Sequence, residues 1–326
     1  MTGLKTAARL VSLVMLVAAH PVEYSDYAGQ FDRFEARTRT VPPDARVAMF
    51  RELFRNLRPG LYTSSDPQRL NHRILRSLQE FPQLQPAYRS VVQRFGPALS
   101  KSVAQFRTVF PDFSPPLPII LAHELGVRDG GTDFIAGKKV MLFGADKIAR
   151  LHNDDSLQPF LDHELFHLEH ARHFADCDPF WCLLWQEGLA TYAASVMTPG
   201  ADDHQLLLDQ PQPIRGATDQ NWKKALCLAA AEFDRSDQAA ITSAFSGGEP
   251  ESPSDLPRRF GYYVGLRVAR EAAGHSTLPE LAALDDEHAR PVVASALGAL
   301  ISNAGAPCGR PSQEAPITRT VDGAPD

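Results

Sequence analysis

The 326-residue sequence has few cysteines, no run of basic residues and only one long apolar run, and each shortage narrows the possible functions. Its four cysteines form no Cys-x-x-Cys pair, which argues against a metal site built from thiolates. The net charge of −6 and the missing basic run argue against nucleic-acid binding. The apolar run, residues 10–19, is shorter than the roughly 20 residues of a comfortable membrane span, so no stable span is expected in the mature protein.

That apolar run instead predicts a secretory signal over residues 1–19. Lys5 and Arg9 supply positive charge near its start, and a small-residue segment that ends at Ala19 fits cleavage before His20. The alternatives are a buried N-terminal helix or an uncleaved anchor. We therefore expect a periplasmic or secreted protein.

An even number of cysteines in an exported chain permits two disulfides. Cys177, Cys182, Cys227 and Cys308 allow three connectivities, and free buried thiols are the alternative. Cys177 and Cys182 flank the predicted turn into a helix that carries Glu187. A bridge from either cysteine could therefore fix that helix.

A metal-binding pattern lies in the middle of the chain, where residues 162–167 are Asp-His-Glu-Leu-Phe-His. On a helix, the spacing of His163 and His167 places both rings on one face, about 6 Å apart along the axis. Two imidazoles so placed can bind one Zn²⁺ ion with Zn–N bonds of about 2 Å. Glu164 points away from that line, so it can accept a proton from a water on the metal instead of binding the ion.

A second helix is predicted after a candidate N-cap at Asp178 and a proline at the first helical position, Pro179. Glu187 lies in the middle of this apolar helix, where an unpaired carboxylate would be costly to bury. We predict that Glu187 is the third metal ligand. Three protein ligands on zinc leave a fourth position for water, as in catalytic sites.

At these residues the chain resembles the gluzincin metallopeptidases, the clan that includes thermolysin-like enzymes and zinc aminopeptidases. Residues 184–192, Leu-Trp-Gln-Glu-Gly-Leu-Ala-Thr-Tyr, are similar to the third-ligand segment of the aminopeptidases. The small size and exported context resemble the "predicted Zn-dependent protease" families of that clan. The resemblance covers about residues 119–192 and 261–265. It implies a zincin-like fold, bound Zn²⁺ and a peptide or protein substrate.

The resemblance also implies two further parts of the site. An antiparallel edge strand upstream of the metal helix binds extended substrate, and residues 140–144 lie where that strand is expected. A tyrosine from a downstream helix stabilises the oxyanion, for which Tyr262 is the first candidate and Tyr263 the second. Two departures limit the comparison. Thr191 stands where thermolysin-like enzymes have aspartate, and the missing Gly-x-Met-Glu-Asn motif means that aminopeptidase activity is not implied.

Three other interpretations compete with this one. His163, His167 and His173 fit the metzincin spacing, with Met197 as a possible Met-turn, although that clan has glycine where this chain has His170. If the helix continued, His173 would lie about 15 Å along the axis from His163, too far to share an ion. The protein could instead bind zinc and a partner without turnover, or hydrolyse a non-peptide amide or epoxide. The presence of Glu164 favours an enzyme, because a metal scaffold needs no general base.

The remaining sequence predicts one α+β unit of zincin type, with a small mixed or antiparallel sheet carrying the histidine helix. Helical segments are expected on both sides, over residues 20–115 and 201–304, around a catalytic core at 116–200 and before a disordered tail at 305–326. In the N-terminal region we expect three or four helices, interrupted at Gly96-Pro97. In the last region, Pro291 is expected to break a helix. The core should contain strands at 118–122, 134–136 and 140–144.

Overall fold

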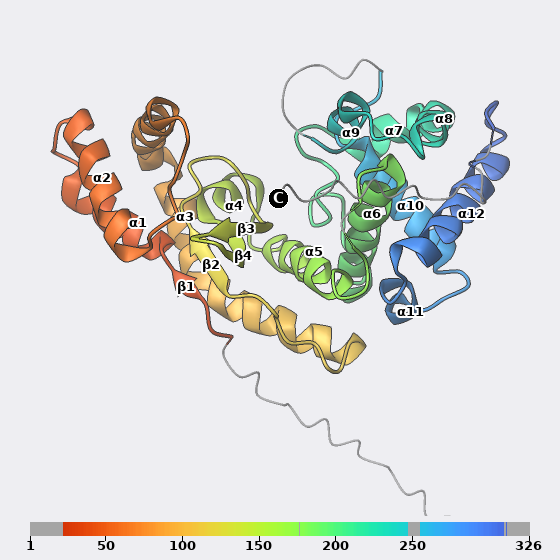
Figure 1. The fold of residues 1–326 in the computed structure, drawn as a ribbon, viewed down its shortest axis with the longest axis horizontal. Helices are drawn as coiled ribbons and strands as arrows, with labels where there is room; N and C mark the ends of the chain where they lie inside the picture. Colours follow the sequence, from red (N-terminus) through yellow and green to blue (C-terminus); the bar gives the residue numbers. More distant parts are fainter. Residues whose placement is uncertain (1–21, 176, 247–254, 310, 312–326) are drawn as a thin grey trace, which may run out of the picture.

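The computed structural model describes residues 22–175, 177–246, 255–309 and 311, and it is mostly helical with a small sheet (Figure 1). The predicted secretory signal and most of the predicted tail lie outside these residues. The first six helices are α1 (Ala28–Thr38), α2 (Pro43–Leu57), α3 (Pro67–Val109), α4 (Ala145–Leu151), α5 (Leu157–His170) and α6 (Phe180–Met197). Those that follow are α7 (Ile214–Gln220), α8 (Trp222–Glu232), α9 (Gln238–Phe245), α10 (Phe260–Ala272), α11 (Leu278–Ala282) and α12 (Asp286–Ala304). The strands are β1 (Ser25–Asp26), β2 (Ile119–Ala122), β3 (Thr132–Ile135) and β4 (Lys138–Gly144).

The sheet is mixed, with the strand order β1-β2-β4-β3. β2 runs parallel to both β1 and β4, whereas β3 pairs with β4 in antiparallel orientation. The predicted mixed sheet is therefore confirmed. The prediction that residues 140–144 form its edge is wrong, because β4 lies between β2 and β3. The edge strand that continues toward the metal helix is β3.

The hairpin between β3 and β4 turns at Ala136 and Gly137, both of which have a positive φ, at 50° and 75°. A two-residue turn of this kind matches the right-handed twist of the flanking strands. Its position sets the register of β3 against β4, with Thr132 opposite Met141.

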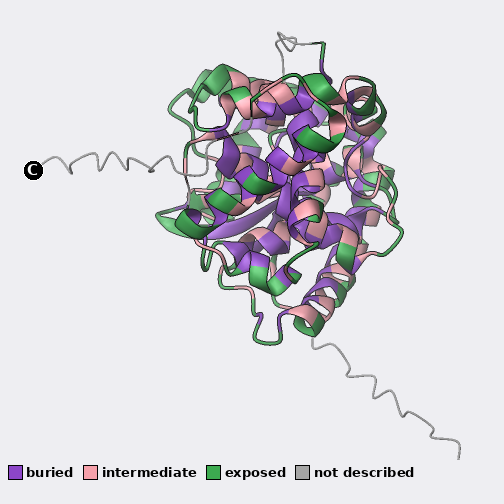
Figure 2. Ribbon diagram, turned by 90° about the vertical axis from the view of Figure 1, so that its right-hand side faces the viewer, coloured by how far each residue is buried: buried purple, intermediate pink, exposed green. Residues whose placement is uncertain are grey.

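Alternate residues of β2 and β4 point to opposite sides of the sheet. Both sides are covered by other parts of the protein. Leu121 and Phe143 join the large core, where the Phe143 ring contacts Phe95 of α3 and Phe160 of α5. The other face, with Val140 and Leu142, packs in a smaller cluster near Tyr27 and Leu61. Figure 2 shows that buried residues continue from the strands into the central helices. This packing holds α5 against the sheet.

The N-terminal region contains three helices, within the predicted number, but the interruption at Gly96-Pro97 is wrong. α3 continues from Pro67 to Val109, through Pro82, Pro86 and Pro97. Each internal proline removes a backbone hydrogen bond and costs about 3 kcal/mol. The helix tolerates them because its buried apolar face stays in helical phase along its whole length. Around the first two prolines this face consists of Phe81, Leu84 and Tyr88.

The C-terminal helices pack on the far side of α6, which lies between α5 and α10 (Figure 1). Gly188 of α6 meets Gly265 of α10 backbone to backbone, and a Cβ atom on either residue would clash with the other helix. Gly188 therefore faces α10 and not α5. The predicted break at Pro291 is also wrong, because α12 runs through this residue and the break lies between α11 and α12.

Two disulfides connect the four cysteines, Cys177–Cys182 and Cys227–Cys308. They select one of the three possible connectivities, and no free cysteine occurs among the described residues. The second disulfide ties the first residues of the predicted tail to α8. Among the helices in the described ranges, none is both long and apolar enough to cross a membrane.

Candidate metal centre

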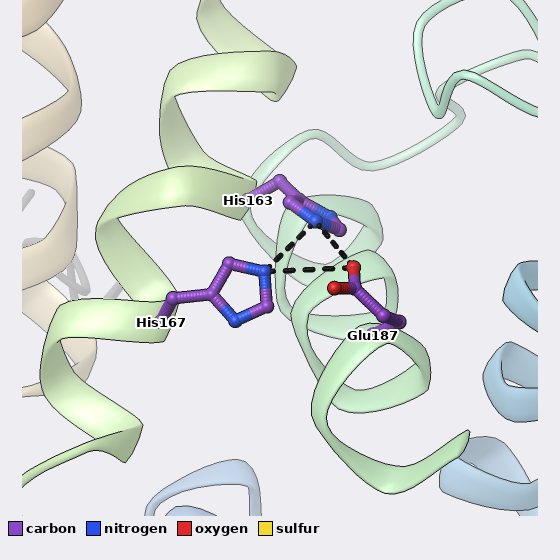
Figure 3. A group of neighbouring side chains, drawn as sticks. All are labelled: His163, His167 and Glu187. Carbon is purple, nitrogen blue, oxygen red and sulfur yellow. Dashed lines mark hydrogen bonds and ion pairs between the residues drawn. The ribbon is translucent and has the colours of Figure 1, made fainter. Parts of the chain in front are cut away.

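The structure brings together the three predicted metal ligands. Figure 3 shows the rings of His163 and His167, from α5, and the carboxylate of Glu187, from α6, pointing toward one another. The Nε2 atoms of the two histidines are 3.1 Å apart. The Oε2 atom of Glu187 lies 3.2 Å from Nε2 of His163 and 3.6 Å from Nε2 of His167.

These three distances match the edges of a tetrahedral metal site. Four ligand atoms at about 2.05 Å from a tetrahedral ion lie about 3.3 Å from one another. The donor set of two imidazoles and one carboxylate is also a combination that zinc accepts in catalytic sites. The group can therefore hold a metal ion with little movement of its side chains.

The charges around the group favour a cation. Burial would raise the pKa of Glu187, but the charge of His167 and hydrogen bonds from both histidines hold it well below its ordinary range. Burial would likewise lower the pKa of His167, but the neighbouring carboxylate of Glu187 raises it to about 9. The pKa of His163 is lowered, mainly by burial. In the metal-free protein, the cluster thus stabilises a positive charge on His167. A bound metal ion would supply that positive charge instead.

Two helices place the ligands. α5 begins after Ser156, whose Oγ accepts a hydrogen bond from the backbone N–H of Asn153 at 2.9 Å. α6 begins at Phe180 with Pro179 in the N-cap position, so the prediction of Asp178 as N-cap was wrong by one residue. The Cys177–Cys182 disulfide closes the start of α6. It therefore anchors the helix that carries Glu187.

Glu164 lines the same cavity as the three ligands, together with Gly130 from the loop before β3. A Cβ atom on Gly130 would lie 2.7 Å from the carboxylate carbon of Glu164, so only glycine allows the loop backbone to approach so closely. Burial, followed by the negative charges of Asp129 and Glu187, raises the pKa of Glu164 to about 8. The carboxyl group is thus half-buried beside the metal group and does not belong to it.

The two candidate tyrosines point to different places. Tyr262 lines the cavity, and its ring centroid is 6.3 Å from that of His163. Burial and then the charge of Glu187 raise its pKa, so its hydroxyl remains a hydrogen-bond donor. Tyr263 points away, where its hydroxyl donates to Asp219 at 2.9 Å and accepts from Arg267 at 3.1 Å. The structure therefore places only Tyr262 where a substrate could meet it.

The cavity has a volume of 540 Å³, in the range typical of ligand sites. Its walls come from the loop before β3, from β4, from α5 and α6, and from the start of α10. Asp129 and Arg259 are charged residues of the walls that were not predicted from the sequence. Asp129 lies 3.6 Å from the ring of His152, and the guanidinium of Arg259 lies 4.2 Å from the ring centroid of Tyr262.

No pattern in the sequence pointed to either residue. Arg259 stands before α10 in the left-handed conformation, at φ 61°, and donates to the carbonyl of Gln210 at 3.2 Å. Burial would raise the pKa of Asp129, but His152 and the charge of Arg259 hold it below its ordinary range. Only the Gly130-Gly131 pair could have drawn attention to this loop, as a place where backbone approaches another group closely.

His173, the third ligand of the metzincin alternative, does not join the metal group. α5 ends at His170, and the exposed His173 borders a separate cavity near Phe110 and Pro279. Met197 is the last residue of α6 and packs in the core. His170 is buried, with its ring stacked on Phe174 at a centroid distance of 4.7 Å.

His170 should make the fold sensitive to acid. Burial, with the charges of His167 and His173, lowers its pKa from 6.5 to about 3. Between these two values the unfolded chain binds a proton that the folded chain does not, so stability falls as the pH falls below 6.5. At pH 5 this costs about 2 kcal/mol. The variant His170→Gln should therefore lose about that much less stability than the wild type between pH 7.5 and 5, in urea unfolding followed by fluorescence.

The matched control for this experiment is His275→Gln, which changes an exposed histidine after α10. It should keep the pH sensitivity of the wild type. Equal sensitivity in His170→Gln and the wild type would contradict the assignment of a neutral, buried His170.

No protein-family model, curated protein or solved structure matches the chain significantly.

Proposed function

We propose that this protein is an exported zinc metallopeptidase of gluzincin type. The observation that carries the proposal is the spacing of the donor atoms of His163, His167 and Glu187, at 3.1 to 3.6 Å. The neighbouring half-buried Glu164 supports an enzyme over a metal scaffold. The two disulfides are consistent with an extracellular or other oxidising location, and this supports export.

The side chains around the metal group suit the hydrolysis of an amide. Zinc held here would polarise a substrate carbonyl and lower the pKa of a water in its open position. Glu164 would accept the proton of the attacking water and deliver it to the leaving amine. A divalent cation near Glu164 opposes the burial that raises its pKa, which favours the ionised base. Tyr262 would donate a hydrogen bond to the oxyanion.

An extended peptide would bind along β3. This strand pairs with β4 on one side only, and the segment before it, from Asp129 to Gly131, lines the cavity. The backbone groups on its free side can add a substrate as a further strand, which binds a peptide without recognising each side chain. Phe134 of β3 is 66% exposed and offers apolar contact to such a peptide. This role replaces the one expected for residues 140–144.

The test is cleavage of an unbiased peptide library by the purified protein loaded with zinc. Cleavage that stops on zinc removal by a chelator and returns on zinc addition supports the proposal. A protein that binds zinc with the stoichiometry of one site and cleaves no peptide would overturn it, and would favour the alternative of metal binding without turnover.

Tyr262→Phe should lower kcat for the best library peptide by about 10²-fold or more, because one oxyanion donor is lost. KM should change little, since the hydrogen bond strengthens only in the transition state. Tyr263→Phe is the matched control on the same helix, because its hydroxyl binds Asp219 and Arg267 outside the cavity. Similar kcat losses in both variants would assign Tyr262 a structural role only.

A further inference from the structure

A second cavity of 540 Å³ lies between the N-terminal half of α3, the start of α4 and the loop after β2. None of its lining residues belongs to the cavity at the metal centre. Its lining is strongly basic, although the whole chain has a net charge of −6. The cationic side chains are Arg69, Arg73, Arg76, Lys147 and Arg150.

The two acidic side chains of this basic cavity already have partners within the protein. Asp146 accepts hydrogen bonds from two backbone N–H groups of the loop after β2, each at 2.6 Å. Glu80 forms ion pairs with Arg76 and Arg150, each at 2.7 Å. Asp146 thus holds the loop, and the single charge of Glu80 is shared between two of the arginines.

The other three cations have no such compensation. Within the part of the chain that the structure describes, no ion pair joins Arg69, Arg73 or Lys147 to an acidic side chain. Arg73 donates one hydrogen bond to the carbonyl of Glu124, at 3.3 Å, which leaves most of its N–H groups available. Cations gathered in a cavity repel one another unless an anion enters, so the arrangement favours an anionic ligand.

The wall that carries these charges is well defined. The loop after β2 contains two successive residues with positive φ, Leu125 and Gly126. Hydrogen bonds from its backbone N–H groups to the Asp146 carboxylate fix this loop. The hydroxyl of Tyr62 also donates to the carbonyl of His123 at the start of this loop, at 2.8 Å. Ser77 also lines the cavity, and its hydroxyl is hydrogen-bonded to Nε2 of His123.

We propose that the basic cavity binds a phosphate group carried by a small molecule or a lipid headgroup. A guanidinium offers paired N–H donors that match two phosphate oxygens, and a lysine adds a compact positive charge. The three uncompensated cations exceed the charge of one phosphate monoester, which carries close to two negative charges at neutral pH. The cavity is much larger than a phosphate ion, so the ligand has an organic part that fills the remaining space.

The test measures binding at low ionic strength to inorganic phosphate, to glucose 6-phosphate and to phosphatidylcholine vesicles that contain phosphatidic acid. We expect the wild type to bind at least one of these probes. The double variant Arg69→Ala/Lys147→Ala should weaken that binding by about tenfold or more, because charge-assisted hydrogen bonds are lost. Calorimetry is suitable for the soluble probes and flotation for the vesicles.

The matched control is Arg33→Ala/Arg37→Ala, which removes the same charge from exposed positions of α1. This double variant should bind as the wild type does. Binding of the soluble probes alone indicates a soluble phosphate ester, whereas binding that includes the vesicles indicates a lipid headgroup, and both results support the site. No binding to any probe, or equal weakening in both double variants, would overturn it.

Discussion

Glu164→Gln is expected to bind zinc as the wild type does and to lose peptide hydrolysis, with kcat reduced by about 10²- to 10⁴-fold. This is the range by which a positioned general base accelerates a reaction. Glutamine keeps the shape of the side chain and can still occupy the space beside Gly130, but it cannot accept the proton of the attacking water. The measurement is steady-state cleavage of the best library peptide, with zinc content determined on the same sample.

Glu169→Gln provides the comparison for this prediction. Glu169 lies on the same helix, is more deeply buried than Glu164, and pairs with Arg172 at 3.1 Å outside the metal group. Its substitution removes a carboxylate from α5 without touching the proposed base. Unchanged cleavage by Glu164→Gln would exclude Glu164 as the base, whatever Glu169→Gln does.

Glu187→Ala should weaken zinc binding by at least about 10²-fold, and cleavage should fall with it. The loss should exceed the 10- to 100-fold effect typical of outer-shell partners, because a ligand and its negative charge are removed. The readout is competition with a chromogenic chelator. Gln186→Ala, at the neighbouring position of the cavity, should keep wild-type affinity because this amide brings no charge.

A second readout separates loss of a ligand from loss of fold in Glu187→Ala. The carboxylate of Glu187 is what raises the pKa of His167 to about 9 against the effect of burial. Without it, the pKa of His167 in the metal-free protein should drop below its ordinary value, as followed by NMR. A pKa that stays near 9 would show that Glu187 does not contact this ring in solution.

The ligand residues could be predicted from the sequence because their signals are local. Helical spacing alone places His163 and His167 on one face, and an isolated carboxylate in an apolar helix needs a partner. The position of β4 could not be predicted in the same way. An apolar strand looks the same at an edge or in the centre of a sheet. Here the parallel pairing of β2 with β4, two strands that are not consecutive in the sequence, decides between these positions.

The misplaced helix breaks have a related cause. Pro97 and Pro291 were interpreted from their local preference to end helices, but the apolar faces of α3 and α12 continue through them. Tertiary burial outweighed the local cost. Arg259 and Asp129 were missed because they reach the cavity from loops, and their approach to Glu164 depends on how α10 and β3 pack around α5.

The backbone contact between Gly188 and Gly265 has a consequence for how substrate preference can change. Gly188 directly follows Glu187, and Gly265 lies one helical turn after Tyr262. Since no side chain separates the two helices here, no rotamer change can widen the gap between the metal ligand and the phenol. The width of that half of the cavity is therefore fixed by the backbone. If the proposed function holds, a change of preference toward longer or bulkier peptides would alter the opposite wall, at positions such as Thr132 and Lys139, and leave the glycine pair unchanged.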